Sequence, residues 1–230
     1  KVVKVPDSAT GRGRFFSYLP LSHIAERLLV EMGCLYSGSE MYFAESLDTF
    51  AVNLAEARPT IFLGVPRIWS KFQSGILSKM PQKKLNLLLS IPLVSSIVKN
   101  KIKTGLGLDK ANHCLSGASP IPPSLITWFS KLGINIQEAY GMTENCAYSH
   151  INRKDKNEVG TVGQPMPLVD VKIGDNGEIL VKSEASMKGY YKNEAATVET
   201  FTADGYLKTG DQCEIGKHGI LKFTGRVEEL

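Results

Sequence analysis

The chain has few cysteines, and nothing in the sequence pairs them. Its four, Cys34, Cys114, Cys146 and Cys213, are far apart in 230 residues, with no Cys-x-x-Cys pair and no pair of neighbouring histidines. Neither a disulfide framework nor a structural zinc site is therefore indicated. Reduced, buried thiols are typical of a cytoplasmic protein, and we expect the chain to act in that compartment.

Long hydrophobic runs are also missing. The most apolar stretch, Leu85–Val98, is 14 residues long and is interrupted by Pro92. A membrane-spanning helix needs about 20 apolar residues, so this stretch is too short to cross a bilayer. Hydrophobic residues make up 43% of the chain and charged residues 22%, as in an ordinary globular protein.

Acidic residues are absent from one long segment. Between Ala57 and Leu108 there is no Asp or Glu, against nine bases: Arg58, Arg67, Lys71, Lys79, Lys83, Lys84, Lys99, Lys101 and Lys103. The whole chain carries a net charge of +4, so the rest of it carries 4 − 9 = −5. Such asymmetry favours an anionic partner, either a ligand phosphate, a membrane surface or nucleic acid; the alternative is a solvated basic face.

The order of predicted elements indicates the fold class. Up to about residue 150, short strands at 15–21, 41–44, 60–63, 113–115 and 134–140 alternate with helical patterns, which favours a parallel sheet covered by helices. Beyond it, short strands follow one another at 159–163, 169–173, 177–181, 206–208 and 220–223. We predict an α/β/α subdomain (1–150), a small, mostly antiparallel β-barrel (151–225) and the start of a hinge (226–230).

The most informative stretch is Tyr140-Gly141-Met142-Thr143-Glu144, after a predicted strand that ends in Glu138-Ala139. The tyrosine offers a flat face to a planar base, and the glycine permits a sharp turn or a close approach. The hydroxyl can bond a phosphate oxygen, and the carboxylate can hold Mg²⁺. An ordinary strand-to-loop turn is the alternative for these five residues alone.

Five other segments accompany this stretch in a fixed order. They are LPLSH (19–23), GVPRIW (64–69), SGASP (116–120), YLKTGD (206–211) and TGR (224–226). Together with YGMTE they resemble the adenylate-forming acyl-CoA synthetases, most closely the long-chain fatty acid ligases, from about Phe15 to Leu230.

The resemblance implies a role for each matching residue. Tyr140 would stack on adenine, Thr143 would bond the α-phosphate and Glu144 would help to hold Mg²⁺, within a nucleotide-contacting run Glu138-Ala139-Tyr140-Gly141-Met142-Thr143. Gly141 would leave space for the acyl group. Asp211, which follows Thr209-Gly210 at a predicted turn, would accept the ribose hydroxyls, and Arg226 would reach ribose or phosphate.

Two further segments complete the implied site. Gly117-Ala118-Ser119-Pro120, between a strand and a helix, would line the adenine and acyl pockets. His23 would help to bind the acid's carboxylate and is grouped with Thr143 and Glu144 as catalytic. Trp69 is interpreted mainly as core, and Gly189-Tyr190-Tyr191 as a structural signature of the barrel.

Two parts of the family pattern are missing from this sequence. The phosphate loop ending in Pro-Lys-Gly is expected upstream of Lys1, and the domain with the adenylating lysine downstream of Leu230, with Glu228 at the pivot position. We therefore expect a fragment of an enzyme that uses ATP, Mg²⁺, a fatty acid and coenzyme A, inactive alone. The alternatives are activation of an aromatic or amino acid, or a non-catalytic nucleotide- or lipid-binding module. Basic segment 57–108 would contact a membrane's inner face peripherally or meet coenzyme A phosphates; no nucleic acid partner is expected.

Overall fold

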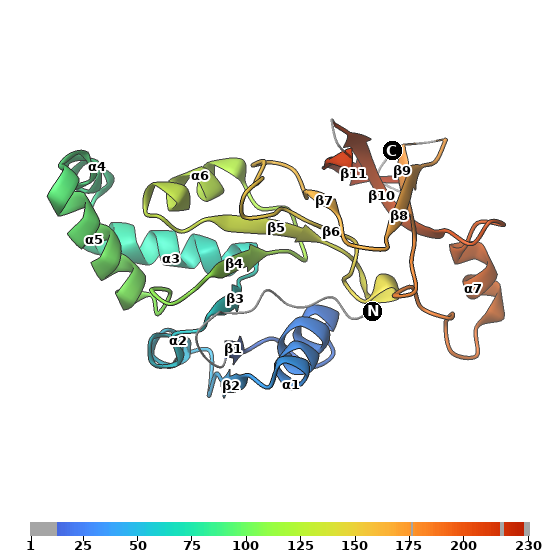
Figure 1. Cartoon of the computed structure of the whole chain (residues 1–230), viewed down its shortest axis with the longest axis horizontal. Coiled ribbons are helices and arrows are strands. Elements are labelled where there is room, and N and C mark those ends of the chain that lie inside the picture. The colour runs from blue at the N-terminus through green and yellow to red at the C-terminus, as the bar shows by residue number, and fades with distance from the viewer. Residues whose placement is uncertain (1–12, 176, 217–218, 228–230) are drawn as a thin grey trace. The chain divides into compact units, whose positions relative to one another are not determined.

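The computed structural model describes residues 13–175, 177–216 and 219–227 (Figure 1). Contacts within the chain define two compact units. The first holds the residues up to Ser22 together with Glu26–Ile136, and the second holds His23–Ala25 together with the chain from Gln137 onward. The boundary at residue 150 stays a prediction, and Glu228, the expected pivot, lies outside the described residues.

The first unit contains a parallel sheet with strand order β2-β1-β3-β4 (Figure 1). Every neighbouring pair in it is parallel. The strands are β1 (Arg14–Ser17), β2 (Glu40–Phe43), β3 (Ile61–Leu63) and β4 (His113–Ser116). Each consecutive pair is joined through helix, as the alternating sequence pattern predicted.

Three helices of the first unit begin at a proline. Pro66, Pro92 and Pro123 each occupy the first turn of a helix, where the missing N–H costs nothing. Pro92 separates two helices within the apolar stretch, as expected. A π-helical segment (Glu26–Met32) precedes α1 (Gly33–Ser37), α2 (Phe50–Ala57), α3 (Pro66–Lys79), α4 (Gln82–Ser90), α5 (Pro92–Gly105) and α6 (Pro123–Lys131).

Trp69 lies at the centre of the first unit's core. Its side chain is fully buried, and its ring makes edge contacts with Phe62 at 5.5 Å and Phe129 at 5.1 Å between centroids. Its indole N–H donates to the backbone oxygen of Leu115, 3.4 Å away on β4. The interpretation of Trp69 as a core residue is therefore confirmed, and the motif GVPRIW packs α3 onto the sheet.

The second unit is antiparallel. β5 (Ile136–Tyr140), β6 (His150–Ile151) and β7 (Gln164–Pro165) pair in that order, and a four-stranded sheet has the order β11-β10-β9-β8. Its strands are β8 (Asp170–Ile173), β9 (Glu178–Lys182), β10 (Leu207–Ile215) and β11 (Leu221–Arg226), with α7 (Glu194–Thr200) between β9 and β10. The predicted class is confirmed: a mostly parallel α/β part is followed by antiparallel sheet.

One predicted strand of the second unit is a loop instead. Residues 159–162 lie outside any strand, and Asn152 holds this region by its side chain. The Asn152 amide donates to the backbone oxygen of Thr161 at 2.6 Å, and its oxygen accepts from the N–H of Glu158 at 3.2 Å. A buried side chain thus binds backbone groups that a strand would have used.

Strands β5 and β6 each carry a buried ionisable side chain. Glu138 is 8% exposed and His150 is 1% exposed. Burial raises the pKa of Glu138 to about 7, although the N–H of Gly160 donates to its Oε2 at 3.2 Å. Burial lowers the pKa of His150 to about 4, so the imidazole is neutral near pH 7.

The two tryptophans should differ in their effect on stability. We expect Trp69→Ala to lower the free energy of unfolding by about 3–5 kcal/mol, because it empties the centre of the core. Trp128→Ala is the control, since Trp128 is only partly buried and its N–H bonds Gln82 between α6 and α4. Urea unfolding of both variants measures the difference, and equal losses would contradict this account of the core.

The buried Glu138 predicts a pH dependence of stability. Between pH 4.5 and 7 the folded chain keeps a proton that the unfolded chain releases, so stability falls as pH rises through this window. Glu138→Gln should remove that fall and raise stability at pH 8 by an amount on the order of 1–3 kcal/mol relative to wild type. His150 acts in the opposite sense, with stability lost as pH falls from 6.5 toward 4.

Urea midpoints at pH 5 and pH 8 test this expectation. Glu184→Gln, at an exposed glutamate, is the control and should leave the pH dependence unchanged. If Glu138→Gln has the same pH profile as wild type, Glu138 does not hold its proton in the folded chain.

Candidate functional site

The loop that follows β5 begins after Tyr140, as the sequence predicted, and folds back on itself. Residues Thr143–Asn145 form a single 3₁₀ turn. The N–H of Met142 donates to the side-chain oxygen of Asn145 at 2.9 Å, and the N–H of Ala147 donates to the oxygen of Met142 at 2.8 Å. Thr143 is left exposed, so its hydroxyl can meet a ligand from solvent.

Gly141 is required by the loop itself. A Cβ at this position would lie 2.5 Å from the backbone carbon of Ala147, closer than any real contact. The loop therefore closes only around glycine at this position. That glycine also leaves room for an acyl group stays a prediction.

Asp211 brings together side chains from three strands. Tyr140 on β5 donates its phenolic O–H to Oδ2 of Asp211 at 2.7 Å. Arg226 on β11 donates to Oδ1 of the same carboxylate at 3.0 Å. Asp211 is 8% exposed. Each carboxylate oxygen keeps a further lone pair, so Asp211 can still accept hydroxyls from a sugar.

The tyrosine of this network is a hydrogen-bond donor over the whole physiological range. Burial, and after it the nearby charge of Asp211, raises the pKa of Tyr140 above its ordinary value. The phenol therefore remains protonated and orients the ring by its bond to Asp211. Three residues that the resemblance assigned to one nucleotide, Tyr140, Asp211 and Arg226, are joined by direct hydrogen bonds.

Asp211 lies in a strand and not at the predicted turn. β10 extends from Leu207 to Ile215, and its pairing with β9 shifts register between Lys208 and Gln212. Gly210, with φ of 70°, supplies the left-handed conformation of this bulge, and its N–H donates to Glu178 at 2.8 Å. The bulge redirects the side chain of Asp211, which lies directly opposite Arg226 on β11.

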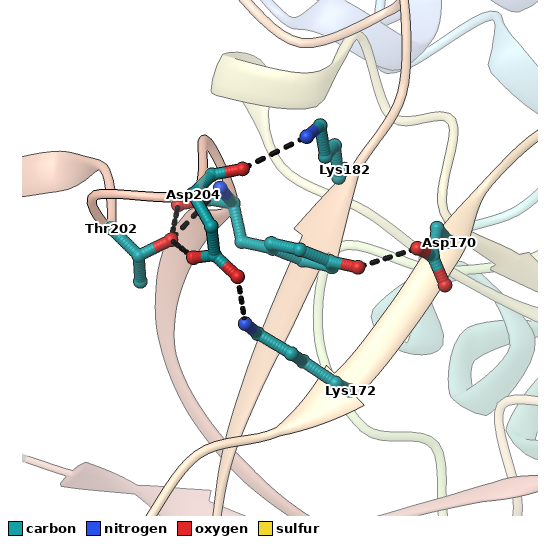
Figure 2. Close-up of polar contacts among 6 residues, drawn as sticks. Asp170, Lys172, Lys182, Thr202 and Asp204 are labelled. Atoms are coloured by element: carbon teal, nitrogen blue, oxygen red, sulfur yellow. Dashed lines mark hydrogen bonds and ion pairs between the residues drawn. The ribbon is translucent and has the colours of Figure 1, made fainter.

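A polar turn fixes the start of β10 (Figure 2). Thr202 accepts from the N–H of Tyr206 at 2.9 Å and donates to the carboxylate of Asp204 at 2.6 Å. The backbone oxygen of Asp204 accepts from Lys182 of β9 at 2.8 Å. The turn is thus held internally and against the neighbouring strand.

Strand β8, which pairs with β9, also contacts this turn (Figure 2). Lys172 forms an ion pair with Asp204, and its ammonium lies 4.0 Å from the centre of the Tyr206 ring. Tyr206 in turn donates its O–H to Asp170. The bond from Lys172, and after it the bond from Thr202, lowers the pKa of Asp204 to about 2. These contacts fix the start of β10, the strand that carries Asp211 five residues after Tyr206.

Glu144 is held by a segment that the sequence marked only as structural. The O–H of Tyr190 donates to Oε1 of Glu144 at 2.9 Å, and the N–H of Met187 donates to the backbone oxygen of Glu144 at 2.7 Å. Tyr190 is 46 residues away along the chain, so no local spacing could have revealed this contact. Glu178, which holds the bulge before Asp211, was missed for the same reason.

The residues of this loop suit a cation that is bound jointly by the protein and by the phosphates of a nucleotide. The described part of the chain contains no group of three or more His, Cys, Asp or Glu side chains that could bind a metal. Magnesium, however, commonly uses one or two carboxylates together with waters and substrate phosphates. A single carboxylate such as Glu144 fits that arrangement and does not fit an all-protein metal cage.

The remaining predicted residues lie elsewhere in the chain. Gly117–Pro120 belong to the first unit, after β4, where Ala118 adopts a φ of 69° and Ser119 and Pro120 are exposed. His23 is partly buried, and its Nδ1 accepts from the N–H of Ala25 at 3.3 Å, a local contact at the start of the helix. Roles for these residues beside Tyr140 stay predictions.

Comparisons with known proteins place this geometry in context. The family model described as AMP-binding enzyme matches residues 2–191. Long-chain-fatty-acid–CoA ligase ACSBG2 of Xenopus laevis is 32% identical over 100% of this chain and 36% of its own length. Long chain acyl-CoA synthetase 3 of Arabidopsis thaliana is 27% identical over 98% of this chain and 39% of its own length. The chain thus spans less than half of these relatives.

Solved structures agree on the fold. The inhibitor-bound N-terminal domain of FACL13 from Mycobacterium tuberculosis matches 94% of this chain and 52% of that one, with a TM-score of 0.68 and 22% identity. At that identity the likeness shows the fold alone. The family model, at residues 2–191, covers most of the chain. This chain belongs to the AMP-binding enzyme family and has long-chain fatty acid–CoA ligases among its relatives.

Proposed function

We propose that this chain is the nucleotide-binding part of a long-chain fatty acid–CoA ligase that uses ATP, Mg²⁺ and coenzyme A. The observation that carries the proposal is that Tyr140 and Arg226 both donate hydrogen bonds to the carboxylate of Asp211. An adenine ring against Tyr140 and a ribose on Asp211 would place the phosphates toward Thr143 and Glu144, on the loop that follows Tyr140. The relatives named as long-chain ligases support a fatty acid as the substrate.

The proposed chemistry has two steps. The fatty-acid carboxylate attacks the α-phosphorus of ATP, the bond to pyrophosphate breaks, and acyl-AMP forms. The thiol of coenzyme A then attacks the acyl carbon, and AMP leaves. In the whole enzyme, the second step would follow a domain rotation.

The residues of this chain have separate tasks in the first step. Asp211 and Arg226 orient the ribose, and Tyr140 fixes the plane of the base. The hydroxyl of Thr143 bonds the α-phosphate, where negative charge accumulates during attack by a second anion. Mg²⁺ at Glu144 would supply positive charge to the phosphate oxygens. His23 would contact the carboxylate of the fatty acid. Gly117–Pro120 would line the adenine and acyl pockets.

We also propose peripheral contact with an anionic membrane, at the cytoplasmic face, through part of segment 57–108. No helix in the part of the chain that the structure describes is long and apolar enough to span a bilayer. Leu87 on α4 and Leu93 and Ile97 on α5 are nevertheless 64%, 84% and 67% exposed. Lys83, Lys84 and Lys101 are exposed on the same two helices, and exposed apolar side chains beside lysines suit an anionic lipid surface.

Pyrophosphate release by the full-length parent tests the enzymatic proposal. With ATP and Mg²⁺ we expect release that depends on a long-chain fatty acid, and acyl-CoA once coenzyme A is present. Asp211→Asn should raise the KM for ATP about 10- to 100-fold, because it weakens the acceptor of the ribose hydroxyls and of Arg226. Asp155→Asn, at an exposed aspartate, should leave the KM for ATP unchanged.

Other outcomes of this assay discriminate the alternatives. Release that needs an aromatic or amino acid would contradict the fatty-acid assignment and keep the adenylating chemistry. No release with any acid, together with retained nucleotide binding, would favour a non-catalytic binding module.

Vesicle sedimentation of the full-length parent tests the membrane proposal. We expect the triple change Lys83→Glu, Lys84→Glu and Lys101→Glu to weaken binding to vesicles with 30% phosphatidylserine at least about tenfold, at ~1 kcal/mol per lysine. The control makes the same change of charge at exposed Lys110, Lys131 and Lys154. Equal vesicle binding by the two triple variants contradicts the proposal. If only the variant at Lys83, Lys84 and Lys101 has a raised KM for coenzyme A, these lysines contact that substrate instead.

A further inference from the structure

One segment holds Glu144 at two points. The N–H of Met187 donates to the backbone oxygen of Glu144 at 2.7 Å, and the phenol of Tyr190 donates to its carboxylate oxygen Oε1 at 2.9 Å. The first bond fixes the main chain, and the second fixes the direction of the carboxylate. Both come from the loop between β9 and α7.

Tyr190 is itself held by the start of α7. Its N–H donates to Oγ1 of Thr197 at 2.8 Å, and its backbone oxygen accepts from the N–H of Asn193 at 3.1 Å. Asn193 is the N-cap of α7, because its side chain accepts from the N–H of Ala196. The capped helix therefore orders the backbone of Tyr190, and the phenol transmits that order to Glu144.

The bond to Oε1 has a consequence for cation binding. An ionised carboxylate has about four acceptor positions, and a phenol that occupies one of them leaves Oε2 for a cation or its bound water. A carboxylate held by a donor loses less rotational freedom when the cation binds. Tyr190 is 38% exposed, so the bond lies at the surface of the site, where a nucleotide can reach Glu144.

We propose that Tyr190 is a positioning residue that orients Glu144 for the Mg²⁺ of a bound nucleotide. The proposal rests on the proposed function, in which Glu144 holds that cation. It adds a role to a tyrosine that the sequence marked only as part of a structural signature.

The chain provides a matched control at the next position. Tyr191 is 87% exposed, and its ring lies 5.3 Å from the ammonium of Lys192. Tyr190→Phe and Tyr191→Phe therefore remove the same atom from adjacent residues, and only the first hydroxyl bonds Glu144. Glu144→Gln gives the effect of losing the charge of the carboxylate.

The experiment measures Mn²⁺ binding by electron paramagnetic resonance on the full-length parent, with saturating ATP and without it. In the presence of ATP, we expect Tyr190→Phe to raise the apparent Kd for Mn²⁺ about three- to tenfold, below the 10- to 100-fold typical of outer-shell partners because the site is partly exposed. Tyr191→Phe should match wild type, and Glu144→Gln should show the largest loss. In the pyrophosphate assay, Tyr190→Phe should raise the Mg²⁺ concentration needed for half-maximal rate while kcat at saturating Mg²⁺ changes less than twofold.

The outcomes separate this proposal from the function on which it rests. Wild type that binds ATP and Mn²⁺ together, with equal Kd values for the two tyrosine variants, overturns the role of Tyr190 alone. A Tyr190→Phe protein that loses affinity for metal-free ATP and for Mn²⁺ equally, with a lowered Tm, also overturns it, because that pattern is a general structural loss. Wild type without ATP-dependent Mn²⁺ binding overturns both proposals.

Discussion

The carboxylate of Asp211 is the constraint on which the second unit's site depends. It is almost fully buried on β10, and a buried charge is stable only when it is paired and hydrogen-bonded. Tyr140 of β5 and Arg226 of β11 supply those partners, one to each oxygen. The same bonds set the plane of the tyrosine ring and the direction of the arginine. One electrostatic requirement thus orders three residues from distant parts of the sequence.

Supporting contacts extend outward from this carboxylate in both directions along the chain. The bulge at Gly210 directs Asp211, Glu178 holds the bulge, and the turn ending at Tyr206 fixes the start of the strand. On the loop after β5, Glu144 is held by the segment before α7. Loops carry the polar groups, and strands or a capped helix hold them in place.

The basic segment shows why charge counted along a sequence differs from charge on a surface. Arg58, one of its nine bases, pairs through two nitrogens with Asp109, which lies just beyond the end of the acid-free segment. The hydrogen bond from Arg58 lowers the pKa of Asp109. The exposed bases of the segment lie on three successive helices: Arg67, Lys71 and Lys79 on α3, Lys83 and Lys84 on α4, and Lys101 on α5. The exposed charge of the segment is thus spread over three helices, and exposed leucine and isoleucine accompany it on α4 and α5.

The sequence by itself determined the class of the fold and most of its elements. Alternating strands and helices predicted the parallel sheet, and six ordered motifs identified the family, because these features depend on local conformation and residue order. Only the tertiary structure decided that Asp211 lies in a strand opposite Arg226, that residues 159–162 form a loop on Asn152, and that Tyr190 contacts Glu144. Each of these depends on pairing register or on a contact between residues far apart in sequence, and no local preference of the chain encodes either one.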